Sequence, residues 1–319
     1  MIENDNEVLY PQKPQLNESE DKKPWFTTLF SLILFVISFV YFFSDQILFL
    51  IILVSALVIH ELGHFIFMKL FKYKKISMVF VPLMGAFVDG RKKKYSQYES
   101  LLVVAAGPFP GIIIGLILLL AYGHHPNQLF FLSALIFIAL NAINLLPLDP
   151  LDGGQLFRLL LSKQSDLFMV VFSFISSLIM ILIGLLMQNW YMVGFGFFLA
   201  IRVRSFQKRY SIRKIFKQNN INYVVDYSNL SNKDYSRMKE IILMDNKLLR
   251  KIRDIDSLED SDIIISSEVN HYLEAPMSND ASSWLKLGIV LFWILSFLIP
   301  MYFLHRVNPF LFDYDILIR

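Results

Sequence analysis

Seven apolar runs occupy much of this chain, and they limit the folds that it can adopt. The runs cover residues 25–44, 47–71, 101–122, 129–147, 167–187, 191–201 and 284–304. A helix needs about 20 apolar residues to cross the ~30 Å hydrocarbon core of a bilayer, and all but one of the runs come close to that length. Hydrophobic residues make up 55% of the chain and charged residues only 18%, unlike a soluble globule. We therefore predict an all-α polytopic membrane protein with six or seven transmembrane helices.

Lysine and arginine are distributed unevenly between the segments that join these runs. The short turns at 44–46, 123–128 and 188–190 contain neither residue. The alternate segments contain Lys22, Lys23, Lys72, Lys74, Lys75, Arg91, Lys92, Lys93, Lys94, Arg158, Lys163, Arg202 and Arg204. Positive residues favour the cytoplasmic side, so we expect a cytoplasmic N-terminus, a second run that enters from outside, and an external C-terminus. The net charge of +3 is too small to imply a nucleic-acid partner.

Residues 1–24 are polar and contain proline, without the basic start and small-residue end of a secretory signal. We expect them to form a disordered tail. The other predicted parts are a transmembrane core at 25–204 with its motif-bearing portion at 47–160, a cytoplasmic, mainly helical insertion at 205–283, a last span at 284–304 and a C-terminal tail at 305–319.

Two parts of this scheme leave alternatives open. The run at 191–201 gives only about 16 Å of helix, so it is either part of a tilted span or a re-entrant segment. In the insertion, residues 231–255 have apolar positions at helical spacing, and Asn232 can cap that helix. A small cytoplasmic helical subdomain that docks a substrate or a regulatory protein is our prediction, and a simple linker helix is the alternative.

The pattern HELGH, at residues 60–64, lies inside the apolar run at 47–71. On a helix, His60 and His64 lie one turn apart on the same face, with about 6 Å between their Cβ atoms. This spacing lets two neutral imidazoles bind one zinc ion, with Glu61 beside them as a general base. Ionisable groups at membrane depth are costly, which favours a functional role over polar residues that are merely satisfied in a helix bundle. The chain has no cysteine, so any other ligand must be His, Asp or Glu.

A catalytic zinc site needs three protein ligands and one open position, so a third ligand must come from elsewhere. The candidate segment is NLLPLDPLDGGQ, at 144–155. Pro147 ends the preceding helix because its ring removes a hydrogen bond, and the glycines after Asp152 allow a sharp turn. Asp149 or Asp152 can then project toward a neighbouring helix. Taken alone, the segment is also compatible with an ordinary loop that carries two solvated aspartates.

Three motifs in combination, HELGH, AAGPFPG and NLLPLDPLDGG, resemble the site-2 protease family of intramembrane zinc metalloproteases. The resemblance covers residues from about 47 to 160. The site residues that it implies are His60, His64 and Asp152 as ligands of one Zn²⁺ per chain, with Glu61 and Asn144 as catalytic residues. In the family, the residue that matches Glu61 activates the water. The residue that matches Asn144 is thought to hold the substrate or the developing oxyanion.

The chain departs from the family pattern at a few positions. Gly111 stands where the family often has an asparagine, and Gly85-Ala86 replaces paired glycines. Asp149 is an extra acid, which either orients a zinc ligand or forms a turn before Pro150. Gly111 and Gly115 also form a small-xxx-small pair, for which we expect packing within the chain.

A transmembrane helix hides its peptide bonds in internal hydrogen bonds, so cleavage of such a substrate requires local unwinding. Residues 77–88 contain β-favouring residues around a proline and a glycine. The resemblance implies a membrane-associated β-hairpin there, whose edge can pair with an extended substrate. A plain connecting loop is the alternative.

The leading hypothesis is a zinc metalloendopeptidase that cuts a single-span membrane protein in or near its transmembrane segment, in a bacterial cell membrane. The lipid bilayer and a regulatory protein at the insertion are the other expected partners. A catalytically silent membrane-binding member of the same fold is the alternative. A metal transporter is less well supported, since the sequence has one site and no internal repeat. His124 and His125 fall in an external turn, where exposed loop histidines are expected.

Overall fold

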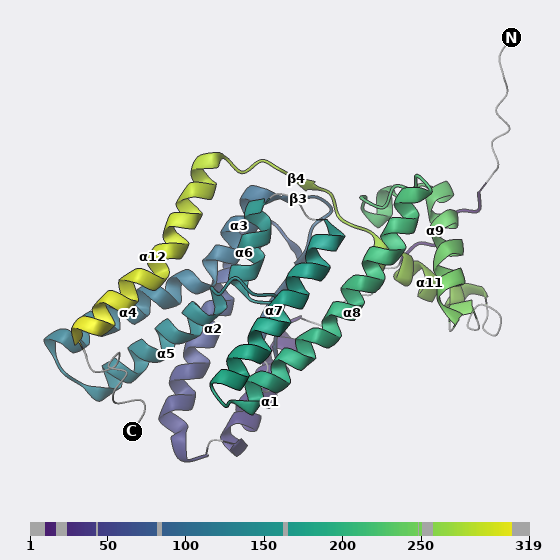
Figure 1. The fold of residues 1–319 in the computed structure, drawn as a ribbon. Helices are drawn as coiled ribbons and strands as arrows, with labels where there is room; N and C mark the ends of the chain where they lie inside the picture. Colours follow the sequence, from purple (N-terminus) through teal and green to yellow (C-terminus); the bar gives the residue numbers. More distant parts are fainter. Residues whose placement is uncertain are drawn as a thin grey trace, which may run out of the picture. The chain divides into compact units, whose positions relative to one another are not determined.

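A computed structural model describes residues 10–16, 24–42, 44–81, 85–161, 165–247, 249–250 and 258–307 (Figure 1). The chain forms two compact units. The accessory unit comprises Met1–Glu20 and Ser165–Met277, and the motif unit comprises Asp21–Gln164 and Ser278–Arg319. The predicted core at 25–204 is therefore divided, because its last two apolar runs belong to the accessory unit. The predicted C-terminal tail lies outside the described residues from position 308 onward.

The motif unit is built mainly from helices. They are α1 (Pro24–Phe42), a 3-10 turn η1 (Ser44–Gln46), α2 (Ile47–Leu70), α3 (Gln97–Ala106), α4 (Pro108–His124), α5 (Gln128–Asn144), α6 (Asp152–Leu161) and α12 (Ser283–Val307). Helices α3 and α4 follow one another at Gly107 and form one apolar segment. Each of the first four predicted runs, and the last, coincides with one of these helices or segments to within a few residues.

Four helical segments among the described residues are long and apolar enough to cross a membrane: Ile47–Leu70, Gln97–His124, Asp166–Leu186 and Ser283–Val307. Trp25–Tyr41 and Gln128–Asn144 are shorter apolar helices. On α2, Leu50 and Ala56 are buried in the unit, whereas Ile51 and Ile66 are exposed. An apolar helix with an exposed apolar face fits lipid rather than water as its surroundings. The protein is therefore a predominantly helical, multi-pass membrane protein.

A two-stranded antiparallel sheet follows α2, as predicted. Its strands are β1 (Lys74–Val81) and β2 (Gly85–Arg91), with a register that runs from Ser77 opposite Asp89 to Val81 opposite Gly85. Pro82, the proline of this segment, lies outside the described residues. Two further short strands are β3 (Tyr95–Ser96) and β4 (Met277–Ser278), and the Ser278 hydroxyl donates a hydrogen bond to the Tyr95 carbonyl over 3.2 Å.

The edge of β1 that faces away from β2 is covered by α1. The Thr28 hydroxyl donates to the Met78 carbonyl over 2.7 Å, and the Phe80 N–H donates to the Ser31 hydroxyl oxygen over 3.1 Å. Phe35 of α1 is buried against Phe80 in the same cluster. The backbone groups that a further strand would pair with are thus already satisfied at these two positions.

The accessory unit contains α7 (Asp166–Leu186), α8 (Trp190–Gln218), a 3-10 turn η2 (Tyr227–Asn229), α9 (Asn232–Asp245) and α11 (Leu258–Tyr272). The short apolar run predicted at 191–201 is the start of the 29-residue helix α8, which continues through the basic residues to Gln218. The side chain of Asn189 caps this helix by accepting from the N–H groups of Tyr191 and Met192. A separate apolar core lies among α8, α9 and α11, centred on Phe216, Met238 and Ile265.

Three details of this unit differ from the sequence-based expectations. Residues 10–16 make defined contacts with residues 227–232, so the predicted disorder of the tail does not hold for this stretch. Helix α9 ends at Asp245 and Asn246 interrupts the helix predicted for 231–255; residues 247, 249 and 250 are again helical, and 248 and 251–257 lie outside the described residues. The cap of α9 is Ser231, which accepts from the N–H of Asp234, and not Asn232, because Asn232 already lies inside the helix.

A candidate metal centre

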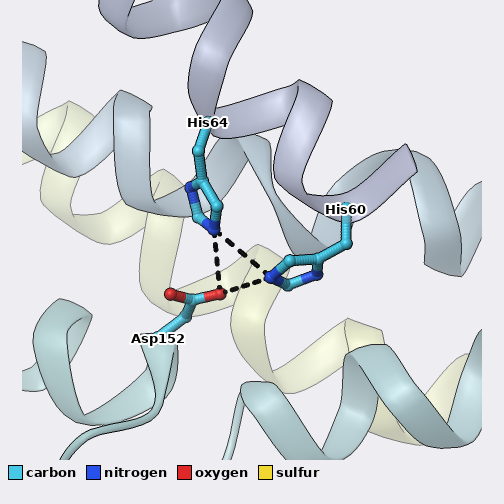
Figure 2. Close-up of side chains that lie close together, drawn as sticks. All are labelled: His60, His64 and Asp152. Carbon is cyan, nitrogen blue, oxygen red and sulfur yellow. Dashed lines mark hydrogen bonds and ion pairs between the residues drawn. The ribbon is translucent and has the colours of Figure 1, made fainter. Parts of the chain in front are cut away.

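Helix α2 carries three buried ionisable side chains within little more than one turn. His60, Glu61 and His64 are 3%, 4% and 8% exposed, respectively. Asp152, which is 7% exposed, is the first residue of α6. Figure 2 shows its carboxylate pointing toward both imidazole rings. The three ligands expected from the sequence therefore meet inside the motif unit.

The three candidate ligand atoms form a compact triangle. Oδ2 of Asp152 lies 3.0 Å from Nε2 of His60 and 3.3 Å from Nε2 of His64, and the two Nε2 atoms are 3.3 Å apart. Tetrahedral zinc with bonds of about 2.0–2.1 Å sets its ligand atoms about 3.3 Å from one another. The triangle formed by these three atoms therefore has the size of three corners of a tetrahedral zinc site.

The hydrogen-bond partner of Nδ1 in each imidazole fixes which ring nitrogen carries the proton. Nδ1 of His60 lies 2.8 Å from Oδ1 of Asn141, and Nδ1 of His64 lies 2.8 Å from the carbonyl oxygen of Val103. Both oxygens can only accept, so each Nδ1 is the protonated donor and each Nε2 presents a lone pair. The amide of Asn141 is itself oriented, because its Nδ2 donates to the Phe137 carbonyl over 2.7 Å.

This arrangement brings two ring lone pairs and a carboxylate oxygen into contact, and such groups repel one another. A cation between them removes the repulsion, so the donor set fits a divalent metal. Oε2 of Glu61 is buried and has no hydrogen-bond partner among the described residues. A water molecule beside the three candidate ligand atoms is the kind of donor that this carboxylate lacks.

Two glycines allow the neighbouring helices to approach the ligands closely. A Cβ atom on Gly107 would lie only 2.2 Å from Nε2 of His64, and one on Gly63 would lie 2.0 Å from the carbonyl oxygen of Ala106. The break between α3 and α4 thus passes directly beside the candidate metal ligands. The AAGPFPG motif of the sequence corresponds to this close approach.

Asn141, whose Oδ1 accepts from Nδ1 of His60, is a residue of the site that the sequence reasoning missed. A Cβ atom on Gly111 would lie 1.9 Å from Nδ2 of Asn141, so the amide on α5 fills the space beside Gly111 on α4. The departure from the family pattern at Gly111 therefore has a physical reason in this chain. The only signal in the sequence was an asparagine that interrupts an otherwise apolar run. Gly115 packs against Ile138 in the same way, which agrees with packing within the chain.

Other predicted residues are placed less directly. The side-chain amide of Asn144 donates to the Leu140 carbonyl of its own helix over 3.1 Å, and none of its described contacts reaches the three ligands. Asp149 is buried, with Nη1 of Arg158 3.7 Å away, so it is not a solvated turn residue. Helix α5 ends at Asn144, shortly before Pro147, as expected. His124 and His125 are exposed.

The fold and this site define a multi-pass membrane protein with a buried His–His–Asp cluster that can bind zinc. In the comparison with known proteins, residues 48–127 match the model described as Peptidase family M50. A zinc metalloprotease of Methanocaldococcus jannaschii is 29% identical over 182 residues, which cover 54% of this chain and 52% of that protein. The chain thus spans about half the length of this curated relative. The resemblance to the site-2 protease family is confirmed.

A solved structure of a site-2 protease from Methanocaldococcus jannaschii is also similar to this chain. The match has 26% sequence identity and a TM-score of 0.42, and it covers 55% of this chain and 87% of that one.

Proposed function

We propose that this protein is an intramembrane zinc metalloendopeptidase that hydrolyses a peptide bond in or near a transmembrane segment of another membrane protein. The observation that carries the proposal is the buried convergence of His60, His64 and Asp152 beside Glu61. Ionisable groups inside an apolar membrane helix are costly and are expected where a function requires them. The match to a peptidase family over residues 48–127 supports a metalloprotease.

The residues divide the chemistry between them. His60, His64 and Asp152 would hold the metal, which when bound supplies Lewis-acid activation of a water molecule and of the scissile carbonyl. Glu61 has a buried, unpartnered oxygen, so it can take a proton from the attacking water and pass it to the leaving amine. Asn141 and the Val103 carbonyl keep both Nε2 lone pairs directed at the site.

Asn144 is the proposed donor to the developing oxyanion. Its amide now donates to the Leu140 carbonyl, so it has to exchange this partner for the substrate during the reaction. Loss of one such donor typically costs about 10²–10³ in kcat. Replacement of Asn144 by alanine is therefore expected to slow cleavage without changing the zinc content.

The substrate is proposed to be a single-span membrane protein, whose helix must unwind before it is cut. Strand β1 offers an edge for the unwound segment, but Thr28 and Ser31 of α1 occupy two of its hydrogen-bonding positions. A substrate strand that pairs there has to displace these hydroxyls. This gives α1 a role in substrate entry.

We further propose that the N-terminus and the residues 205–283 lie in the cytoplasm of a bacterial cell, with the C-terminus outside. Residues 10–16 bind to residues 227–232, so both must be on the same side of the membrane. The chain must therefore cross the membrane an even number of times between these two segments. This condition is met when α8 is the sixth span. The asymmetric distribution of lysine and arginine supports the cytoplasmic assignment.

The decisive experiment compares wild type with two variants, purified and co-expressed with a single-span substrate. Glu61→Gln is expected to keep stoichiometric zinc and lose cleavage, whereas Asp152→Asn is expected to lose most of both. Asp45→Asn, in the turn before α2, is the control that keeps both properties. Equal cleavage by Glu61→Gln would end the protease proposal. Zinc binding without any cleavage by wild type would favour a catalytically silent membrane-binding protein.

A further inference from the structure

Lys13, in the N-terminal stretch, is held by a turn of the accessory unit. Its Nζ atom donates to the carbonyl oxygens of Tyr227 over 2.6 Å, Ser228 over 3.1 Å and Leu230 over 2.6 Å. An ammonium group has three N–H donors, and these three carbonyls use all of them. The turn is therefore a complete cradle for one primary ammonium group.

The backbone around Lys13 is bound as well. The N–H of Lys13 donates to Oδ1 of Asn232 over 3.2 Å, and the Tyr227 hydroxyl donates to the Pro14 carbonyl over 2.9 Å. The ammonium also lies 5.2 Å from the centre of the Tyr227 ring. Pro11 and Pro14 flank the lysine and favour an extended chain that leaves its carbonyls available. The turn thus contacts both the side chain and the backbone of the bound segment.

The cradle is built without help from the segment that occupies it. Asp226 caps the η2 turn by accepting from the Ser228 N–H, and Ser231 caps α9 directly afterwards. The Tyr227 ring packs edge-on against Tyr235, whose hydroxyl is hydrogen-bonded to Ser266 inside the unit. These contacts all lie within residues 226–266, so none of them depends on the N-terminal stretch.

We propose that residues 226–232 form a docking site for an extended peptide with a lysine next to a proline, and that residues 10–16 are its intramolecular occupant. A cytoplasmic partner that carries a peptide of this kind binds only by displacing the chain's own N-terminus. Three carbonyls that converge on one point suit an ammonium group better than the flat fork of a guanidinium. Lysine acetylation removes the charge and leaves one donor, so it closes the site to a modified peptide.

The intramolecular occupant has a large advantage over a free peptide. A segment tethered by a short linker competes at an effective concentration in the millimolar range. A partner peptide of ordinary affinity is therefore excluded until the N-terminal stretch is released. The N-terminal stretch therefore blocks the docking site within the same chain. This docking does not depend on whether the protein cleaves peptides.

The test uses a fluorescein-labelled synthetic peptide of residues 8–18 and full-length protein in detergent, with fluorescence anisotropy as the measurement. Lys13→Ala in the protein is expected to free the cradle, so the peptide should bind this variant at least ~10-fold more tightly than wild type. Lys22→Ala, which removes a basic residue elsewhere in the same tail, is the matched control and should bind as weakly as wild type. The same peptide with acetyl-lysine at position 13 should bind neither protein.

A second pair of measurements tests the turn itself. Tyr227→Phe combined with Lys13→Ala should weaken peptide binding about 5-fold, because the donor to the Pro14 carbonyl is gone. In wild type, amide hydrogen exchange of residues 12–15 should be slower than in the Lys13→Ala variant. Failure of the peptide to bind Lys13→Ala would overturn the proposal, and so would equal binding of the acetylated peptide.

Discussion

The side chain of Asn141 holds the His60 ring from a position 81 residues further along the chain. Its oxygen accepts the Nδ1 proton, and its nitrogen is anchored to the Phe137 carbonyl, so the amide cannot turn over without losing a hydrogen bond. Such a partner of a ligand histidine sets the tautomer and the angle of the ring. At the scale of single residues, the proposed zinc site is therefore expected to depend on a group that is not itself a candidate ligand.

Replacement of Asn141 by leucine is expected to lower zinc affinity about 10–100-fold, because the His60 ring loses its acceptor and its fixed orientation. Competition with a chelator of known affinity, on purified protein, measures the change. Asn144→Ala is the matched control, since this neighbouring asparagine bonds only within its own helix among the described contacts and should leave zinc affinity unaltered. Unchanged zinc affinity in Asn141→Leu would contradict the orienting role.

The sequence predicts His60, Glu61 and His64 as one group because a helix repeats its faces every three to four residues. Asp152 required the comparison of two distant motifs. Asn141 and the Val103 carbonyl could not be predicted, because their positions depend on the rotation of α3 and α5 about their axes relative to α2. Hydropathy does not encode that rotation when a helix is apolar on all sides.

Among the elements, the contact between α1 and β1 bears most directly on the proposed route of substrate entry. The Thr28 and Ser31 hydroxyls take the place of the backbone groups of a third strand. The two hydrogen bonds are each worth about 0.5–1.5 kcal/mol, which is small enough for a substrate to compete with them.

The double variant Thr28→Val, Ser31→Ala is therefore expected to raise the initial rate of cleavage at least ~5-fold at subsaturating substrate, because the β1 edge is no longer occupied. Ser38→Ala is the control, since the Ser38 hydroxyl donates to the Phe35 carbonyl in its own helix and not to the sheet. A lower rate in the double variant would show that these hydroxyls support the active form instead of competing with substrate.

A second element-scale prediction concerns Arg213 on α8, which is 6% exposed. Its guanidinium donates to Asp166, Glu274 and the carbonyls of Tyr272 and Leu273 over 2.7–2.9 Å. Arg213→Met leaves two carboxylates without their cation and should destabilise the accessory unit by about 3–5 kcal/mol. Hydrogen exchange of the α11 amides measures the loss.

Replacement of Glu274 by glutamine is expected to have a smaller effect than Arg213→Met. It should lower the free energy of unfolding by less than about 1 kcal/mol at neutral pH. Burial raises the pKa of Glu274 above its ordinary value, against the opposing effect of the Arg213 charge. A raised pKa in the folded state means that the acid stabilises the fold at low pH and loses this contribution as the pH rises through the folded value. The stability of Glu274→Gln relative to wild type should therefore improve as the pH rises from about 4 to 7.

Hydropathy predicts where the apolar helices lie, but not how they continue or break. The start of α8 was recognised as a short run, yet the helix extends to Gln218 because its later turns pack Ile212 and Phe216 into the core of the accessory unit. The sequence did not predict that the helix is interrupted at Gly107, because glycine and proline are common within membrane helices. The β1–β2 hairpin was expected from the family resemblance, because the β-favouring residues around a proline and a glycine are also compatible with a plain connecting loop.

At the scale of the whole molecule, the proposed arrangement across the membrane can be tested simply, because the native chain contains no cysteine. Each introduced cysteine is then the only thiol. In intact cells, a membrane-impermeant maleimide should label His125→Cys and Arg319→Cys, whereas Asn222→Cys should react only after lysis. Labelling of Asn222→Cys in intact cells would reverse the proposed orientation.

The sequence was informative about the whole molecule where composition and charge decide the outcome, as with the multi-pass helical architecture. It was wrong about the N-terminal stretch at 10–16, which is polar enough to resemble disorder. The contacts that hold this stretch come from carbonyls more than 200 residues away, and backbone carbonyls leave no trace in the identity of the residues that carry them.

The contact between Gly111 and Asn141 has a consequence for how this site can vary. The two positions share one small volume between α4 and α5, so a bulky group on one helix requires an empty place on the other. They should therefore change as a couple: an asparagine introduced at 111 is tolerable only together with a glycine at 141. Such an exchange would move the residue that orients the His60 imidazole from α5 to α4 and leave the candidate ligands in place.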